Sequence, residues 1–418
     1  MTPTPPPNQE RDSPIALTYL YDISLPSTWA AAIQILNTCH SLATLGVPTT
    51  VYVRSLARDT AECLASYDLK PLPNFKVLQM PSHWRWRLPW PWPIRSPRSD
   101  DGRRTHIVMS RGDSALKLSS LLRSARRRHA LVVYEAHRLS FAHEIERQSG
   151  QKWNGSVPRR GPIRRLYETE RTTVGTADGI VCLTDDVRDA LTREFRLTAP
   201  VLVLPSGTRV AQEPPDGAAL RDIDVIYAGK LMTRKGIPLL MDAMRYLPGR
   251  SLVVLGGSPE EVDASRSLLR GEDLQSRIDF KGFVEPRQVP TYLARARVGV
   301  CPLPPGVSIT SERFTSSLKV LELMAAGTPV VACDLPSMRS MLTHGETGWL
   351  VPAGDPDALA VGIRTLLEDR ALADRLATAA RERVRAFSWT ERARQLRGFL
   401  EKLASHTSTA AARADYRG

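Results

Sequence analysis

The chain has 418 residues, of which 42% are hydrophobic, and a formal net charge of +13 at pH 7. That length is sufficient for two domains of ordinary size, each with its own core. No apolar run approaches the roughly 18 residues of a spanning helix, and no signal sequence precedes the first predicted strand. Five cysteines without paired spacing are typical of a reducing compartment. We therefore expect a cytoplasmic protein.

The N-terminal half begins with alternating elements. Residues 1–12 are rich in proline and polar residues, so we expect a disordered tail there. An apolar strand over residues 15–20 and a loop over 21–26 follow. Residues 29–45 have apolar side chains at helical spacing and stop at Gly46, and a second strand covers 49–53. This order predicts a βαβ unit and a parallel sheet.

Tryptophan and arginine are concentrated between residues 83 and 95, where Trp84, Trp86, Trp90 and Trp92 alternate with arginine and proline. Tryptophan favours the headgroup region of a bilayer, and clustered arginine favours anionic lipid. We therefore expect this segment to dock on an anionic membrane surface. The alternative is that the rings pack on their own domain. We expect no nucleic-acid partner, because no recognisable motif accompanies the positive charge.

A buried strand predicted over residues 131–136 carries two candidate site residues at its carboxyl end. Residues 131–136 form an apolar run, so Glu135 lies within the strand and His137 follows its carboxyl end, where open α/β sheets place ligands. His137 could also be an ordinary interface histidine. Another strand is expected over 177–184. A stretch rich in glycine and proline, residues 206–221, then predicts an interdomain linker.

The C-terminal half repeats the alternation of strands and helices. An apolar strand over residues 225–228 leads into Gly229 and Lys230, and Lys235 opens the next helical pattern. The Gly256-Gly257 pair follows another strand, but a dinucleotide-binding glycine spacing is missing, so we interpret the pair as a plain turn. The Asp222-Ile-Asp224 string only precedes a strand, and we find no cluster that predicts a metal ion.

The segment from Ser316 to Asp334 is the most informative one. Ser316 or Ser317 can cap a short apolar helix, Gly327 suits its C-terminal end, and a buried strand follows. The free amides and positive dipole of a helix N-terminus favour phosphate. Glu322 lies about one turn further along, where a carboxylate can accept hydrogen bonds from a ribose diol. Together these features predict a bound nucleoside diphosphate.

These motifs resemble those of retaining GT-B glycosyltransferases of the family 4, or group 1, type, which include sucrose-phosphate synthase and bacterial mannosyltransferases. The resemblance is strongest over residues 222–388. It implies two Rossmann-like α/β domains facing a cleft: an acceptor domain over 13–205 and a donor domain over 222–388. A final helix over 389–405 would cross back to the first domain, followed by a disordered tail over 406–418.

The resemblance also implies a function: transfer of a sugar from a nucleotide-diphospho-sugar to the hydroxyl of a sugar, a lipid-linked or another acceptor, in glycan, glycolipid or polysaccharide synthesis. It requires no cofactor and no metal. The catalytic residues it implies are Lys230, Lys235 and His137. The donor would be held by Gly229, Gly282, Phe283, Val284, Ser316, Ser317, Leu318 and Glu322. The expected acceptor or sugar contacts are Pro26, Ser27, Thr28 and Glu135.

The chain also departs from the family pattern. Phe314 stands where the family has a first glutamate, eight residues before Glu322, and Lys230 replaces the usual arginine. Two alternatives to a transferase therefore stay open: a sugar-nucleotide epimerase of the same fold, and a non-catalytic scaffold. The intact lysines and Glu322 favour an enzyme over a scaffold.

Overall fold

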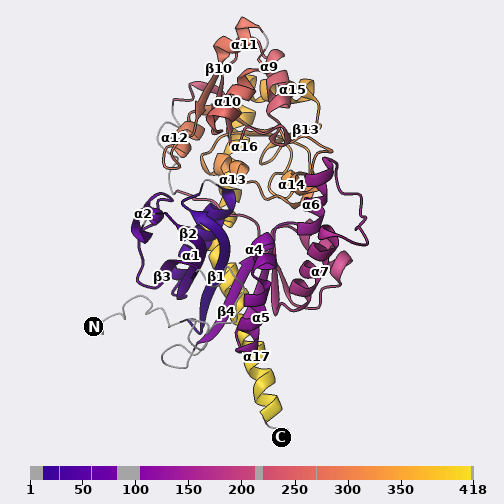
Figure 1. The fold of residues 1–418 in the computed structure, drawn as a ribbon. Coiled ribbons are helices and arrows are strands. Elements are labelled where there is room, and N and C mark those ends of the chain that lie inside the picture. Colours follow the sequence, from indigo (N-terminus) through magenta and orange to yellow (C-terminus); the bar gives the residue numbers. More distant parts are fainter. Residues whose placement is uncertain are drawn as a thin grey trace, which may run out of the picture.

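The computed structural model describes residues 13–27, 29–57, 59–81, 104–211, 220–269 and 271–415, and side chains as far as residue 406 except that of residue 272. Figure 1 shows two domains stacked one above the other, with the final helix running down past the first domain. Each domain contains one parallel sheet with helices on both faces. This arrangement confirms the predicted class of two Rossmann-like domains.

The sheet of the first domain has seven described strands in the order β3-β2-β1-β4-β5-β6-β7, all parallel. The strands are β1 (Ile15–Leu25), β2 (Thr49–Leu56), β3 (Phe75–Gln79), β4 (Thr105–Arg111), β5 (Leu131–Ala136), β6 (Gly179–Cys182) and β7 (Val201–Val203). The helices are α1 (Ala30–Thr44), α2 (Thr60–Ala65), α4 (Gly112–Lys117), α5 (Ser119–Arg127), α6 (Ser140–Ser149), α7 (Pro162–Gly175) and α8 (Asp185–Phe195). Because helices cover both faces, the central strands are almost entirely apolar.

The first strand is longer than the sequence predicts. Residues 21–26 were expected to form a loop, but β1 continues to Leu25. The long neighbouring strand β2 supplies the backbone partners, through the pairs Tyr21 with Val53 and Leu25 with Leu56. The register shifts between Tyr21 and Ser24, so the extension bends while it stays paired.

The second domain has a six-stranded parallel sheet in the order β10-β9-β8-β11-β12-β13. Its strands are β8 (Ile223–Ala228), β9 (Leu252–Leu255), β10 (Ile278–Gly282), β11 (Ala296–Cys301), β12 (Val330–Cys333) and β13 (Trp349–Val351). Its helices are α9 (Ile237–Arg245), α10 (Pro259–Arg266), α11 (Glu272–Arg277), α12 (Val289–Ala294), α13 (Leu318–Ala325), α14 (Pro336–Arg339), α15 (Pro356–Glu368) and α16 (Arg370–Arg383). Three short helical turns are η1 (Thr233–Lys235), η2 (Thr310–Phe314) and η3 (Val384–Phe387).

The last helix, α17 (Trp389–Asp415), belongs to the second domain in sequence but packs on the first. Its apolar side chains Ala393, Leu396, Leu400 and Leu403 join the core formed by β1, β2 and α1. The helix also continues through Asp415, whereas the sequence predicts a disordered tail from residue 406. In Figure 1 this extension projects below the first domain.

The start of the predicted linker is ordered and largely buried. The Ser206 amide donates to the Ser316 hydroxyl (3.0 Å), and the Ser206 hydroxyl donates to the Ser316 carbonyl (3.0 Å). Thr208 forms a bridge with Ser388, just before α17. Residues 206–208 are therefore a junction between the two domains rather than a free tether. Residues 212–219 lie outside the described residues.

A second contact between the domains is made by the segment around η2. Phe314 is only 2% exposed because its ring lies in the apolar core beneath α6, α7 and α8 of the first domain. Nearby, Glu146 accepts hydrogen bonds from the Ser308 hydroxyl and the Ile309 amide, both at 3.0 Å. Arg313 pairs with Asp186 at 2.8 Å. A segment of the second domain thus packs as part of the first domain.

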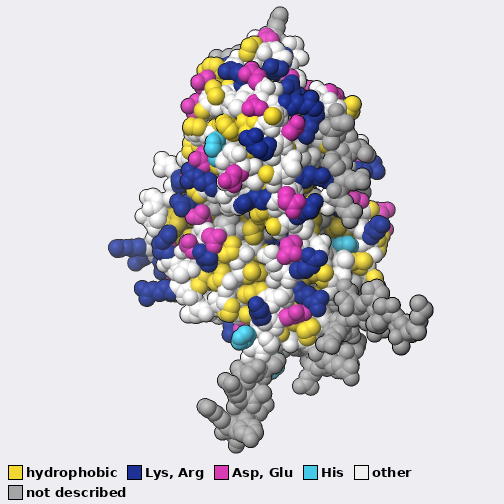
Figure 2. All heavy atoms as spheres, turned by 180° about the vertical axis from the view of Figure 1, so that it is seen from behind, with side chains coloured by type: hydrophobic (Ala, Val, Ile, Leu, Met, Phe, Trp, Pro, Cys, Tyr) yellow, Lys and Arg dark blue, Asp and Glu magenta, His cyan; other side chains and the backbone are white. Residues whose placement is uncertain are grey.

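No helix in the described part of the chain is long and apolar enough to cross a membrane. The tryptophan-rich segment, residues 83–95, lies outside the described residues, as do the termini at 1–12 and 416–418. Figure 2 shows the reverse face of the molecule, on which basic and acidic side chains are interspersed between apolar patches. The described part of this face therefore carries no single continuous basic surface.

Arg392 of α17 provides a test of how the helix is held. It is 3% exposed and pairs with Glu135 of β5 at 2.8 Å, and Glu135 is equally buried. Arg392→Leu should lower the free energy of unfolding by about 3–5 kcal/mol, because Glu135 is then a buried charge without its cation. Urea denaturation is the measurement.

The matched control is Arg394→Leu, which removes an exposed pair with Glu391 two residues further along and should cost less than about 1 kcal/mol. The double change Arg392→Leu with Glu135→Gln should recover part of the loss. Equal losses for Arg392→Leu and Arg394→Leu would contradict this account.

Candidate active site

Three glycine turns follow adjacent strands of the second sheet. Gly229 follows β8, Gly256 follows β9, and Gly282 ends β10. The Gly229 amide donates to Leu255 (2.9 Å), and the Gly256 amide donates to the Gly282 carbonyl (2.6 Å). A Cβ on Gly256 would lie 2.4 Å from the Gly229 carbonyl oxygen. The turns therefore stack closely at the carboxyl edge of the sheet, where open α/β sheets bind ligands.

Four cationic side chains gather beside these turns: Lys230, Arg234, Lys235 and Lys319. Burial, with the neighbouring charges of Lys319, Arg234 and Lys230, lowers the pKa of Lys235 to about 8. Lys319, in the first turn of α13, has its Nζ 3.9 Å from the centre of the Tyr227 ring. Lys230 lies over the ring of Trp29 from the first domain, at 3.6 Å. Lysines 230 and 235 thus lie together, as the resemblance predicts.

These four cations have no carboxylate partner within hydrogen-bonding distance among the described residues. The Nζ atom of Lys319 is buried without any hydrogen-bond partner, and burial lowers the pKa of this amine. A buried cation without a partner is unfavourable. Lys230 and Lys319 contact the aromatic rings of Trp29 and Tyr227, and an anion with several oxygen atoms would suit the cluster.

Glu322 faces the same region from the next turn of α13. Burial raises its pKa to about 7, partly offset by the charge of Lys319. Its carboxylate has no hydrogen bond within the described part of the chain. The acid is therefore available to accept hydrogen bonds from a polar ligand, as expected for a ribose-binding carboxylate.

The serines before α13 differ from expectation. Ser317 is the N-cap residue, but its side chain makes no capping hydrogen bond. Ser316 is buried, and its hydroxyl accepts from the Ser206 amide instead of facing a ligand. Its expected donor contact is therefore replaced by a structural one, because the linker passes directly over it. Leu318 begins the helix, and its amide, like others in a first turn, has no intrahelical acceptor.

The segment expected at the nucleobase has one exposed ring. Phe283 is 64% exposed, immediately after Gly282, which has a φ of 62°. Val284 is half-buried against the core of the second domain. An exposed aromatic side chain in a strand-end loop can stack on a flat ligand, so this geometry is compatible with the predicted base contact.

The carboxyl edge of the first sheet holds Glu135 and His137 in one buried network. Glu135 accepts from the Tyr19 hydroxyl, from His137 (3.0 Å) and from Arg392 (2.8 Å). Burial opposes its ionisation, but His137, Arg392 and Arg111 outweigh that and hold its pKa well below the usual range. Glu135 is therefore an ion-pair partner in the core, and its predicted acceptor contact stays a prediction.

His137 has both ring nitrogens engaged. Arg111 lies 2.7 Å from Nδ1, and Glu135 lies 3.0 Å from Nε2. Because arginine only donates and a carboxylate only accepts, the ring is the neutral tautomer with its proton on Nε2. Burial and the charge of Arg111 agree with this, since they lower the pKa of His137 to about 4. Both ring nitrogens of His137 are therefore occupied within the protein, and its predicted role stays a prediction.

The loop after β1 is only partly described. The Ser27 amide donates to the Tyr67 hydroxyl (2.6 Å), which in turn donates to the Ser27 carbonyl (2.8 Å). Pro26 follows Leu25 through a cis peptide bond. Thr28 lies outside the described residues. The loop leads to Trp29, and this ring under Lys230 brings it next to the cation cluster.

Sequence reasoning missed two residues of this region. Lys319 stands in the Ser-Leu-Lys string before Glu322, and its position one turn away from that acid could have indicated it. Arg111 ends β4, next to β5 in the sheet, but nothing in the local sequence distinguishes it from other arginines. What places Arg111 beside Glu135 is the register of β4 and β5, in which the two residues are paired.

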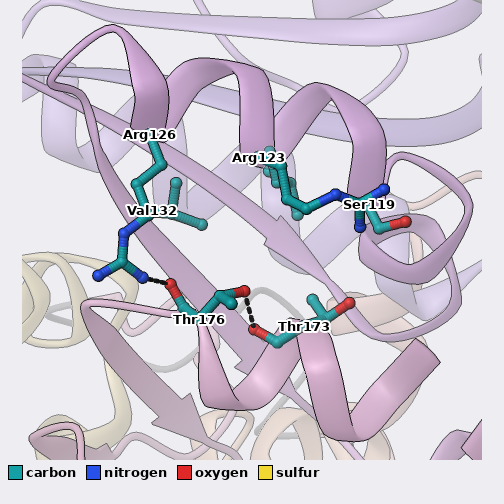
Figure 3. A pocket seen from close by; sticks show the side chains of 7 residues that line it. Ser119, Arg123, Arg126, Val132, Thr173 and Thr176 are labelled. Atoms are coloured by element: carbon teal, nitrogen blue, oxygen red, sulfur yellow. Dashed lines mark hydrogen bonds between the residues drawn. The ribbon is translucent and has the colours of Figure 1, made fainter. Parts of the chain in front are cut away.

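A small hollow elsewhere in the first domain has a different character. Ser119, Arg123, Arg126, Val132, Thr173 and Thr176 line it with Leu122 between α5 and α7 (Figure 3). Arg126 closes it by donating to the Thr176 carbonyl. Val132 is near the start of β5, so the hollow lies at the sheet edge opposite His137. No described group of three metal-ligating side chains occurs there or elsewhere in the described residues.

The two parallel Rossmann-like domains define a GT-B fold. Two family models match the chain in succession. The one described as "Glycosyltransferase Family 4" matches residues 31–212, and the one described as "Glycosyl transferases group 1" matches residues 222–369. The chain belongs to this glycosyltransferase family.

Individual relatives cover less of the chain. A phosphatidyl-myo-inositol mannosyltransferase of Mycobacterium leprae is 36% identical over 189 residues, 44% of this chain and 48% of that protein. A D-inositol 3-phosphate glycosyltransferase of Xylanimonas cellulosilytica is 30% identical over 259 residues, 57% and 60% of the two chains. The chain thus spans about half the length of these relatives.

Solved structures extend the similarity over both domains. Sucrose-phosphate synthase from Thermosynechococcus elongatus has a TM-score of 0.71 at 20% identity, covering 94% of this chain and all of that one. Anabaena HepE, solved in complex with UDP-glucose, has a TM-score of 0.66 at 16% identity over 93% of this chain and all of that one. At these identities the similarity shows the fold.

Gly236, which precedes α9 directly after Lys235, tests how the cation cluster is positioned. Its φ is 84°, and a Cβ there would lie 1.6 Å from the Pro302 carbonyl oxygen. Gly236→Ala should therefore lower the free energy of unfolding for two reasons, the left-handed backbone conformation and the clash with Pro302. The clash should add about 1–3 kcal/mol to the cost of the left-handed conformation. Thermal and urea unfolding measure the loss.

Gly249→Ala is the matched control, because Gly249 has a φ of 70° and no atom within 4 Å of its added Cβ. If the two alanine variants are equally stable, the close approach of η1 to Pro302 does not constrain the loop.

Proposed function

We propose that the protein is a retaining glycosyltransferase that moves a sugar from a nucleotide-diphospho-sugar to an acceptor hydroxyl. The observation that carries this proposal is a group of cations without a carboxylate partner among the described residues: Lys230, Arg234 and Lys235 between β8 and α9, and Lys319 at the start of α13. Glu322 lies one turn after Lys319. Such a group matches a diphosphate joined to a ribose: cations for the phosphates and a carboxylate for the diol.

In the proposed reaction the bond between the sugar C1 and the β-phosphate oxygen breaks, and a bond from C1 to the acceptor oxygen forms on the same face. The acceptor proton passes to the departing phosphate. Negative charge grows on the diphosphate, so Lys235, Lys319 and the first amides of α13 would stabilise the transition state electrostatically. These lysines need no movement to do so, because they already lie together.

For His137 we propose a positioning role. Its ring lies between Arg111 and Glu135, and Glu135 is fixed by Arg392. This chain of contacts would orient the Arg111 guanidinium at the edge of the acceptor domain. We propose that the acceptor hydroxyl is brought there, opposite the donor phosphates.

The acceptor class is suggested by the relatives, two of which are named for phosphatidylinositol and inositol 3-phosphate. We propose action in glycolipid or polysaccharide synthesis at the inner membrane surface. The tryptophan- and arginine-rich segment supports that location through composition alone.

A panel of UDP, GDP and ADP sugars tests the proposal. A ligand at about 100 times its dissociation constant should add roughly 2.7 kcal/mol of stability, seen as a thermal shift. Release of the free nucleoside diphosphate only when an acceptor is present would distinguish a transferase from an epimerase. Absence of any shift across the panel would support the non-catalytic scaffold.

Glu322→Ala should weaken binding of the responding nucleotide by about 2–3 kcal/mol, since hydrogen bonds to a charged acceptor are lost. Titration calorimetry on the folded variant measures this, with the deoxyribose nucleotide of the same base as a second probe. The deoxyribose ligand should lose less on mutation than the ribose ligand. Unchanged ribose-nucleotide affinity in the alanine variant would refute the assignment.

Lys235 should make nucleotide binding depend on pH. In the free protein its pKa is about 8, and a bound diphosphate raises that pKa because it stabilises the protonated form. Affinity should therefore be full below pH 8 and fall above it, by at most about tenfold per pH unit. Calorimetry between pH 7 and 9.5 measures the slope.

Lys235→Arg keeps its charge throughout this range and should remove most of the decline, whereas Lys235→Ala should lower turnover more than binding. A decline of the same slope in Lys235→Arg would assign the titration to another group.

A further inference from the structure

The carboxyl edge of the first sheet carries buried polar atoms that its own contacts do not use. We propose that this edge binds a phosphate group of the acceptor, through Arg111, Arg138 and His143, so that the acceptor is an anion. The inference rests on the proposed transferase function, and it names the chemical class of the second substrate.

The topology brings these residues together. Strands β1, β4 and β5 are neighbours in the sheet. Arg111 ends β4, His137 follows β5, and Tyr21 lies within β1 directly after the Leu20–Ser110 pair. Besides burial, the charges of Arg111 and Arg138 both act on the pKa of the Tyr21 hydroxyl. Burial and the charge of Arg138 lower the pKa of His143, which lies one turn into α6. One edge of one sheet therefore presents two guanidinium groups and an imidazole in a single region.

Two buried side-chain nitrogen atoms at this edge have no hydrogen-bond partner within the described part of the chain. The Nη2 atom of Arg111 is used by His137, but its Nη1 atom is buried without a hydrogen-bond partner. The Nδ1 atom of His143 is also buried and unpartnered. Buried polar atoms in native proteins are satisfied in the great majority of cases. Two unsatisfied atoms at one sheet edge indicate that a ligand completes them.

The Arg111 guanidinium has no hydrogen-bonded carboxylate of its own. Arg138 pairs with Asp113 at 2.8 Å, and Glu135 accepts from Arg392 and His137. Among the described residues, the hydrogen-bond partner of the Arg111 guanidinium is the neutral ring of His137. An anion that binds the buried Nη1 atom would give this guanidinium a charged partner.

Across the cleft, Arg234 of the donor cluster is near enough to influence His143 electrostatically. The acceptor edge therefore faces the donor phosphates, which places a bound acceptor next to the bond that breaks. The three side chains come from different elements: Arg111 ends β4, Arg138 follows β5, and His143 lies in α6. A phosphate has enough acceptor oxygens to bind several such donors at once, whereas a planar carboxylate suits a single guanidinium fork.

The test uses inorganic phosphate as the probe, titrated into the full chain saturated with the nucleoside diphosphate found in the panel. The nucleotide occupies the lysine cluster, so further phosphate binding reports the acceptor edge. Calorimetry in 0.15 M salt suppresses weak surface association. Arg111→Gln and Arg138→Gln should each weaken phosphate binding by roughly tenfold or more, as expected for lost charge-assisted hydrogen bonds.

Arg127→Gln is the control, because it removes the same charge from an exposed position of α5 and should change phosphate affinity less than about twofold. No phosphate binding in the nucleotide-saturated protein, or equal binding in wild type, Arg111→Gln and Arg138→Gln, would overturn the proposal.

If no nucleotide binds, the transferase proposal fails, and the phosphate site is tested separately. The comparison is then Lys235→Ala with and without Arg111→Gln: a loss of phosphate binding on the second change supports the site, and no loss overturns it. Competition shows the source of the phosphate. Displacement by sn-glycerol 3-phosphate indicates a soluble acceptor, and displacement only by phosphatidylglycerol vesicles indicates a lipid headgroup.

Discussion

The buried ion pair between Arg392 and Glu135 connects the parts of the molecule on which the proposed site depends. Arg392 comes from the last helix and also donates to Thr38 of α1 (3.0 Å) and to the Leu204 carbonyl (2.6 Å). Glu135 then fixes His137, which contacts Arg111. One guanidinium thus joins the returning helix, the interdomain junction and the acceptor edge. Because neither charge can reach water, removal of either one destabilises all three.

The two edges that face the cleft have the same electrostatic character. Lys319 and Arg111 each retain a buried donor atom without a hydrogen-bond partner, and burial and neighbouring cations lower the pKa of Lys235 to about 8. Such groups reduce the stability of the free protein. An anion bound at these atoms would remove that cost, and the proposed affinity would come from it. We regard this shared property as the physical basis of both proposals.

The departure at Phe314 has a structural consequence. Where the family has an acid, this chain has a ring that fills the core of the opposite domain, and the neighbouring contacts of Glu146 and Arg313 tie the same segment down. The segment therefore helps to hold the domains together. Lys319, five residues later, is a charged side chain that reaches the glycine turn after β8, where its Nζ lies 3.1 Å from a Cβ built on Gly229.

The sequence by itself determined the layered α/β class and the position of Glu322, because apolar periodicity, helix ends and glycine turns are local properties of the chain. It also placed Lys230 and Lys235 on one loop. It could not reveal that Glu135 is neutralised by Arg392, 257 residues away, or that Ser316 is covered by the linker. Those outcomes depend on which distant groups share a low-dielectric interior. Only the tertiary structure decides that, since local patterns contain no information about long-range partners.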